Sequence, residues 1–201
     1  MKKIFVFFAI VALCSFSLVR DPLTEQERKF ANDYLTETQN SLVDITQKLS
    51  DAQLKFKPAA DKWSVEECVK HIAAAETGLW KMADSVINSP ANPEKRSEIK
   101  LADADFMQRI RSRENKVKTF SSYEPVNTPY KSLDEAVDDF KSKRADLVKY
   151  AKTSTGNMRD HIVEGMMGMM DTYQLILVLS GHTARHTAQI EEIKQHPNFP
   201  K

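Results

Sequence analysis

Apolar residues recur along much of the chain at alternating spacings of three and four, which is the period of an amphipathic helix. Four stretches carry this pattern: 24–51, 64–88, 132–151 and 171–196. Three of them open with a capping pair, in which a hydroxyl or carboxylate residue precedes a Glu or Gln by three positions. The pairs are Thr24 with Glu27, Ser64 with Glu67, and Asp171 with Gln174. The pattern therefore predicts four long helices.

The segment 89–131, between the second and third predicted helices, is long for a helical bundle. Antiparallel neighbours need a connection of only about two to eight residues. A link of this length indicates a crossover between two parallel helices, or a cover over an active site. A short apolar repeat inside it predicts one extra helix, with Phe106, Ile110, Val117 and Phe120. We expect an all-α protein, a four-helix bundle over residues 24–196 whose long crossover joins helices two and three.

Composition agrees with a helical, soluble protein. The 201 residues include only five glycines and eight prolines, too few for a turn-dense all-β fold. With 29 basic and 28 acidic residues the formal charge is +1, which gives no general attraction to nucleic acid or to anionic membranes. The densest basic cluster is interpreted as a solvated helix face, so no nucleic-acid partner is expected. Its members are Arg109, Arg111, Arg113, Lys116 and Lys118.

The first seventeen residues have the layout of a secretory signal peptide. Two lysines precede an apolar run from Ile4 to Phe16, and Ser17 follows as a small residue. The run is shorter than the roughly 20 residues that span a bilayer, so no stable membrane span is expected. We predict an extracytoplasmic protein, periplasmic or secreted. Lipid attachment at Cys14 is the less favoured alternative, because Leu13 is larger than the residue that usually precedes a lipidated cysteine.

Three histidines form the candidate site. His182 and His186 are four residues apart, so they share one face of the fourth predicted helix. That face should point into the core, as should the face of the second helix that carries His71. Buried imidazoles need polar partners, and one metal ion would satisfy all three. Separate core histidines, each bonded to a backbone carbonyl or to a carboxylate such as Glu67, are the alternative that periodicity leaves open.

Two segments of the chain resemble the signature segments of the DinB-like superfamily. They are Lys62–Glu67 followed by His71, and Gly181–Ile190, and the resemblance extends over about residues 25–195. It implies a four-helix bundle with a long second link and a divalent metal, zinc or nickel, held by three histidines. Carried over by position, the ligands are His71, His182 and His186.

The resemblance implies chemistry on a small molecule, either hydrolysis or thiol-dependent transfer. Export favours hydrolysis, because small thiol cofactors are chiefly cytoplasmic. A zincin-type protease is disfavoured, because Thr183 stands where that motif has its glutamate. The alternative function is a non-catalytic bundle that binds a metal or a small ligand. The substrate stays open, as does the choice between a monomer and a homodimer.

Several other residues have more than one interpretation. Cys68, alone once the signal is removed, is a fourth ligand, a reactive thiol or a small buried residue, and we favour the last. The methionine-rich segment Met158–Met170 either binds copper or, as we favour, packs the mouth of the bundle. His161, in the same segment, either reaches the metal or, as we favour, is an exposed loop residue. Carboxylates that could accept a hydrogen bond from a histidine ring are Glu76, Glu191 and Glu192.

Overall fold

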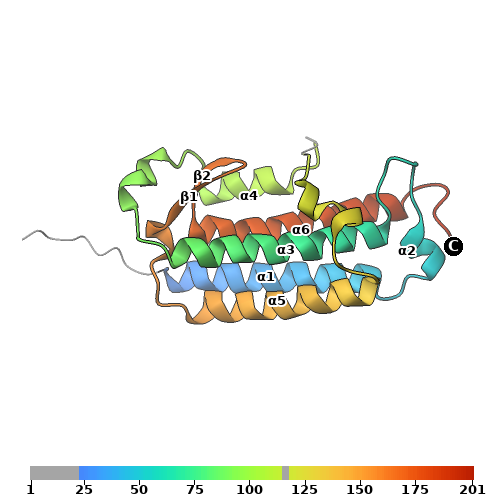
Figure 1. The fold of residues 1–201 in the computed structure, drawn as a ribbon, viewed down its shortest axis with the longest axis horizontal. Coiled ribbons are helices and arrows are strands. Elements are labelled where there is room, and N and C mark those ends of the chain that lie inside the picture. The colour runs from blue at the N-terminus through green and yellow to red at the C-terminus, as the bar shows by residue number, and fades with distance from the viewer. Residues whose placement is uncertain (1–22, 115–117) are drawn as a thin grey trace, which may run out of the picture.

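Four long helices form the body of the protein. The structure is a computed structural model that describes residues 23–114 and 118–201 (Figure 1). The predicted signal peptide, together with Lys116 and Val117, lies outside the described residues. The long helices are α1 (Glu25–Thr46), α3 (Val65–Ile87), α5 (Leu133–Thr153) and α6 (Thr172–Lys194). The predicted all-α four-helix bundle is thus confirmed. Across the described ranges, no helix is both long and apolar enough to cross a membrane.

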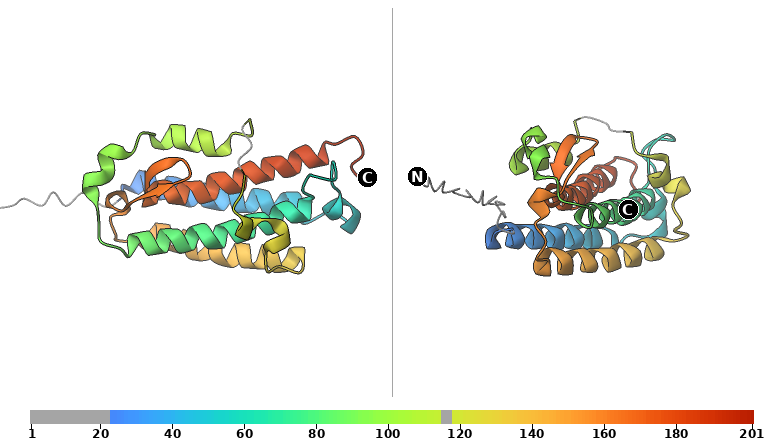
Figure 2. Two further views of the ribbon diagram at one scale, coloured as in Figure 1. Left: turned by 45° about the horizontal axis from the view of Figure 1, so that its top comes forward. Right: turned by 60° about the vertical axis from the view of Figure 1, so that its left-hand side comes forward.

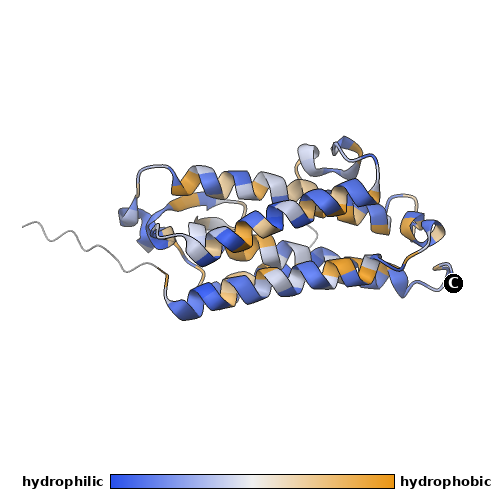
Figure 3. Ribbon diagram, turned by 90° about the horizontal axis from the view of Figure 1, so that it is seen from below, coloured by the Kyte–Doolittle hydropathy of each residue, from blue (hydrophilic) through white to orange (hydrophobic). Residues whose placement is uncertain are grey.

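The direction of the helices confirms the predicted crossover. Helices α1 and α6 run one way along the bundle, and α3 and α5 run the other way (Figures 1 and 2). Helix α3 packs beside α5 and α6, while α1 packs beside the same two helices from the opposite corner. The consecutive helices α3 and α5 are therefore parallel neighbours, which a short loop cannot join. Figure 3 shows that hydrophilic residues cover most of the outer helix faces.

The crossover link returns along the length of the bundle and covers one side of it. It contains the 3₁₀ turn Pro93–Glu98, the helix α4 (Asp103–Arg111), and the turns Ser121–Tyr123 and Pro125–Asn127. Helix α4 packs on α6, and the two later turns pack on α3. Phe106 is buried, as predicted, whereas Phe120 is exposed beyond the end of α4. The link is both a crossover and a cover.

Two glycines allow the link to approach the bundle closely. A Cβ atom on Gly78 of α3 would overlap the ring of Tyr123, and one on Gly181 of α6 would overlap the side chain of Ile110. Both glycines stand inside helices, where a glycine normally lowers stability relative to alanine. Their presence is explained by this contact with the link.

The first helix ends earlier than the sequence indicates. Helix α1 stops at Thr46, not near Asp51, and a separate short helix, α2, covers Asp51–Lys55. Ser50 starts α2 with a reciprocal capping pair to Gln53. Leu49 still packs against the core although it lies outside the helix. The apolar spacing therefore continues past the end of the helix, which explains why the sequence pattern predicted a longer helix.

A two-stranded hairpin, absent from the prediction, precedes α6. Strands β1 (Ile162–Gly165) and β2 (Gly168–Asp171) pair antiparallel, with Gly168 at a φ of 99° after the turn. This is the methionine-rich segment. Met158 and Met170 are buried, in agreement with a packing role, but Met166 at the turn is 61% exposed.

Candidate metal centre

Three imidazole rings meet between α3 and α6. The Nε2 atom of His71 lies 3.1 Å from Nε2 of His182 and 3.2 Å from Nε2 of His186. One ring nitrogen from each residue lies within 4.8 Å of the other two. His71 and His186 are buried, and His182 is partly buried. The structure thus brings together all three residues that the sequence singled out, from positions more than a hundred residues apart.

Hydrogen bonds on the far side of two rings fix where their protons are. Nδ1 of His71 lies 2.8 Å from the backbone oxygen of Tyr123, and Nδ1 of His186 lies 2.8 Å from Oε1 of Gln189. Both oxygens can only accept, so each Nδ1 carries the proton and each neutral ring keeps a lone pair on Nε2. Arg113, which can only donate, also bonds Oε1 of Gln189 at 3.3 Å, in agreement with that oxygen being an acceptor.

Burial keeps the three rings neutral. It lowers the pKa of His71 below the usual value, although the bond to Tyr123 acts in the opposite direction. Burial also lowers the pKa of His186 to about 3, with a further contribution from the neighbouring His71. The pKa of His182 falls well below its usual range, through burial and then the nearby histidines. At neutral pH none of the three rings therefore carries a second proton, and the single protons of His71 and His186 are assigned to Nδ1.

The spacing of the nitrogen atoms fits a metal ion. Bonds of about 2.0–2.1 Å in a tetrahedral site place two nitrogen ligands about 3.3 Å apart, and a cis pair in an octahedral site about 3.0 Å apart. The observed separations of 3.1 and 3.2 Å lie between these values. Three neutral imidazoles also leave coordination positions open, as in catalytic rather than closed structural sites.

Trp63 forms a wall of the cluster. Its ring centroid lies 4.8 Å from that of His71 and 6.1 Å from that of His186. The next residue, Ser64, caps the start of α3 and so fixes where this wall stands. Trp63 also lines a pocket of about 450 Å³ with residues of the crossover link, including Glu124. Neither this pocket nor a larger groove of about 810 Å³, between α1, α4 and α6, is lined by any of the three histidines.

The other candidates lie elsewhere. Cys68 is fully buried in the apolar core, and burial raises the pKa of its thiol to about 12. It does not join the histidine group. His161 is partly buried rather than exposed, and its backbone oxygen accepts from Thr172 at the start of α6. That point is ten residues before His182, or about 15 Å along the helix.

The carboxylates proposed as acceptors for the rings have other partners. Glu76 pairs with the buried Arg144, and Glu192 pairs with Arg113. Glu191 is exposed beside Lys194. The acceptors are instead the amide of Gln189 and the backbone of Tyr123. Gln189 stands three residues after His186, a helical spacing that could have suggested it, whereas no sequence signal points to a backbone oxygen 52 residues away.

Comparison with known proteins agrees with this architecture. The solved structure "YfiT from Bacillus subtilis is a probable metal-dependent hydrolase with an unusual four-helix bundle topology" matches with a TM-score of 0.60 and 12% identity, over 90% of this chain and 93% of that one. At this identity the likeness shows a shared fold. No curated protein matches. The sequence model of the DinB superfamily matches residues 34–190, which is most of the chain. The chain belongs to the DinB superfamily.

Proposed function

We propose that this protein is a metal-dependent enzyme that acts on a small molecule, with His71, His182 and His186 as the metal ligands. One arrangement carries the proposal: Nδ1 of each ring faces an acceptor, Tyr123 or Gln189, so the proton is assigned to Nδ1 and the Nε2 lone pairs of His71 and His186 face each other at 3.2 Å. Two lone pairs at that distance repel, and a cation between them turns the repulsion into two bonds. Both rings are held in the tautomer that metal ligation requires.

We propose zinc or nickel as the metal. Imidazole nitrogens suit both, and the nitrogen spacing is compatible with four-coordinate zinc and with six-coordinate nickel. When bound, such an ion supplies a Lewis acid with open positions for water and substrate. The protein's own part is to hold the rings neutral, to orient two of them through Tyr123 and Gln189, and to wall the site with Trp63.

Hydrolysis is the reaction we favour, and thiol transfer is the second. The description of YfiT as a probable metal-dependent hydrolase supports the first choice. Cys68 does not supply a thiol for the second, because it is buried in the core and its pKa is raised to about 12. The location proposed from residues 1–17 also favours hydrolysis, because exported proteins lack ready access to small cytoplasmic thiols.

A non-catalytic metal-binding or ligand-binding protein is the second candidate function. It is favoured by one feature: the acceptors that hold His71 and His186 are an amide and a backbone carbonyl, and among the described residues no carboxylate is hydrogen-bonded to these two rings to act as a general base. We propose a small molecule as partner in both cases, and no nucleic acid.

Metal analysis tests the proposal. The purified protein is replenished with zinc or nickel, desalted and analysed for bound metal. The variants His71→Ala and His186→Ala are treated in the same way. His196→Ala is the control, because the His196 ring lies near Phe56 and away from the cluster. We expect about one equivalent in the wild type and the control, and strong loss in the other two. Less than about one-tenth equivalent in the wild type would overturn the proposal. Assays with ester, amide and thiol-transfer substrates then separate enzyme from binder.

A further inference from the structure

We propose that Arg144 is a positioning residue for the metal centre: its buried network sets the register of α6 against α3 and so the spacing of the three histidines. This inference rests on the proposed function of the cluster. Arg144 stands on α5, and none of its nitrogens contacts the rings. Its effect on the spacing of the rings would be exerted through the helices that carry them.

Every N–H group of Arg144 has a partner. Nε and Nη2 donate to the two carboxylate oxygens of Glu76, at 2.6 and 2.8 Å. Nη2 also donates to Oγ1 of Thr183 at 2.8 Å. Nη1 donates to the backbone oxygen of Leu35 at 2.9 Å and to Oγ1 of Thr38 at 2.8 Å. The guanidinium group is fully buried and all five of its donors are satisfied.

The partners stand on the three other long helices. Leu35 and Thr38 belong to α1, Glu76 to α3 and Thr183 to α6. The guanidinium group is planar and its donors have fixed directions, so sliding any of these helices along the bundle would break at least one bond. Apolar contacts between helices have no such directionality. Arg144 therefore fixes the positions of all four long helices relative to one another along the bundle axis.

The Arg144 network lies next to the histidine cluster along the bundle. Thr183 follows His182 directly and precedes His186 by three residues, and Glu76 is five residues after His71, about 7.5 Å along α3. A slip of α6 by one residue would move its histidines by about 1.5 Å and turn them by about 100°. The Nε2 contacts of 3.1 and 3.2 Å would not survive such a change.

An apolar replacement should show where the network acts. Buried ion pairs are a weak source of stability, and replacing both partners by apolar residues of similar size is often neutral or stabilising. If the network mainly sets register, removing both charges should leave stability but disturb the metal centre. If the network only stabilises the fold, removing both charges should lower stability and leave the metal centre unchanged.

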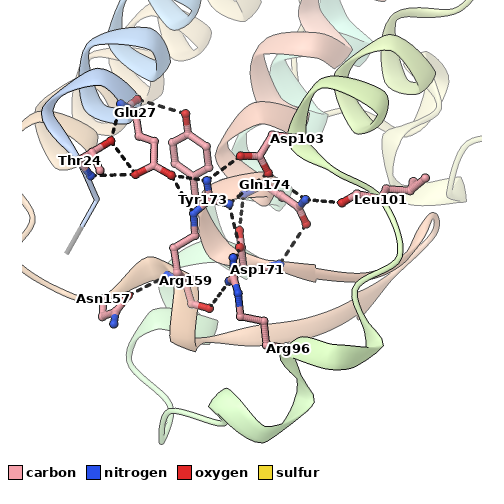
Figure 4. Close-up of polar contacts among 10 residues, drawn as sticks. All are labelled: Thr24, Glu27, Arg96, Leu101, Asp103, Asn157, Arg159, Asp171, Tyr173 and Gln174. Carbon is pink, nitrogen blue, oxygen red and sulfur yellow. Dashed lines mark hydrogen bonds and ion pairs between the residues drawn. The ribbon is translucent and has the colours of Figure 1, made fainter. Parts of the chain in front are cut away.

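The bundle offers a matched control at its other end. Arg159 lies between Glu27, Asp103 and Asp171, and its guanidinium carbon lies 4.2 Å from the ring centroid of Tyr173 (Figure 4). This second network joins α1, α4 and the start of α6. It has no partner on α3, the helix that carries His71. Its removal should lower stability without changing the histidine spacing.

The experiment compares the wild type, the double variant Glu76→Leu with Arg144→Met, and Arg159→Met. Urea unfolding of the metal-free proteins gives stability, competition with a chromophoric chelator gives zinc affinity, and the visible spectrum of bound Co²⁺ reports coordination geometry. We expect the double variant to unfold at a urea concentration no lower than the wild type, to bind zinc at least about tenfold more weakly, and to give an altered Co²⁺ spectrum. Arg159→Met should unfold at lower urea and keep the wild-type affinity and spectrum.

Each other outcome is decisive. A double variant that binds zinc within about twofold of the wild type, with an unchanged Co²⁺ spectrum, would overturn the inference and leave the proposed function standing. A wild type that binds neither ion would overturn both. If the double variant does not unfold cooperatively, Thr183→Val takes its place, since it keeps the shape and removes the bond from Arg144 to α6, together with the hydroxyl's own bond to the Leu179 backbone oxygen within that helix. Weaker zinc binding in that variant supports the inference, and unchanged binding refutes it.

Discussion

The backbone oxygen of Tyr123 accepts a hydrogen bond from Nδ1 of His71, so the crossover link orients a side chain of α3. The ring of the same tyrosine covers Gly78, two turns further along that helix. One residue of the link is therefore fixed to α3 at two points. Anything that lifts its ring from Gly78 should also disturb the bond to His71.

Gly78→Ala tests this connection. The added methyl group would overlap the Tyr123 ring, and overpacking of this kind costs about 1–3 kcal/mol. Alanine is about 1 kcal/mol more favourable than glycine inside a helix, so the free energy of unfolding in urea should fall by a net amount of roughly 1 kcal/mol. Zinc binding should also be weaker. In a Tyr123→Ala background the same substitution should be neutral or stabilising. Equal destabilisation in both backgrounds would show that Tyr123 is not the cause.

Gln189→Leu should weaken metal binding with little effect on the fold. It removes the acceptor of His186 Nδ1 and one partner of Arg113. Loss of a group that orients a metal ligand typically costs about 10–100-fold in affinity. Zinc competition measures the effect, and Gln108→Leu, at an exposed position on α4, is the matched control. Similar affinities for the two variants would contradict the role assigned to Gln189.

Cys68 should resist alkylation in the folded protein. Thiolate is the reactive form, and burial both shields this sulfur and raises its pKa to about 12. Mass spectrometry after iodoacetamide treatment at pH 8 should find Cys68 unmodified in native protein and fully modified in urea. Rapid labelling of the native protein would revive the interpretation of Cys68 as a reactive thiol.

Glu27 should contribute to acid sensitivity. Burial acts to raise its pKa, but hydrogen bonds from Arg159 and Thr24 outweigh it, so the pKa in the folded protein lies below the ordinary 4.5. The unfolded chain then binds more protons in this range, and the stabilisation present above about pH 4.5 is lost as pH falls through the folded-state pKa. Glu27→Gln should therefore cost roughly 0.5–1 kcal/mol at pH 7, and less at pH 3.

Urea unfolding at several pH values measures this difference. Glu25→Gln, at an exposed position in the same turn of α1, is the control for the loss of one negative charge. A difference between Glu27→Gln and the wild type that stays constant from pH 7 to pH 3 would refute the assignment.

The proposed export is tested by the compartment and the N-terminus of the recovered protein. Expressed with its own residues 1–17 in a bacterium that has a periplasm, the protein should be recovered from the periplasm with an N-terminus near residue 18. A lipid-bearing Cys14 at the N-terminus would identify the alternative processing. Retention of Met1 in a cytoplasmic product would contradict export.

Local spacing predicted the long helices and the inward faces of the histidines, and the family resemblance then indicated that His71 joins His182 and His186. The capping pairs at Thr24, Ser64 and Asp171 all form as expected. The break after Thr46 escaped notice because Leu49 packs on the same core from outside the helix. The hairpin was missed because its methionines and glycines lack the β-branched alternation typical of strands.

The buried ion pair of Arg144 and Glu76 could not be predicted from the sequence, for a different reason. Arg144 and Glu76 are charged residues at ordinary positions in helical stretches, where charge usually means a solvated surface. Only the packing of four helices makes them neighbours 68 residues apart. The partner of His71, the backbone oxygen of Tyr123, depends on the path of the crossover link, which no local pattern specifies.

The order of the chain also affects when the site can exist. His71 precedes His182 by 111 residues, and the whole crossover link and the third long helix lie between them. Contacts of such long range form late, because the intervening chain must first be confined. A growing chain that ends before α6 can offer only His71, and a partly folded chain offers at most the pair His182 and His186, which would hold a metal ion more weakly than all three rings together. Tight metal binding would therefore serve as a sensor of completed folding, and its onset after dilution from denaturant would time the last step of assembly.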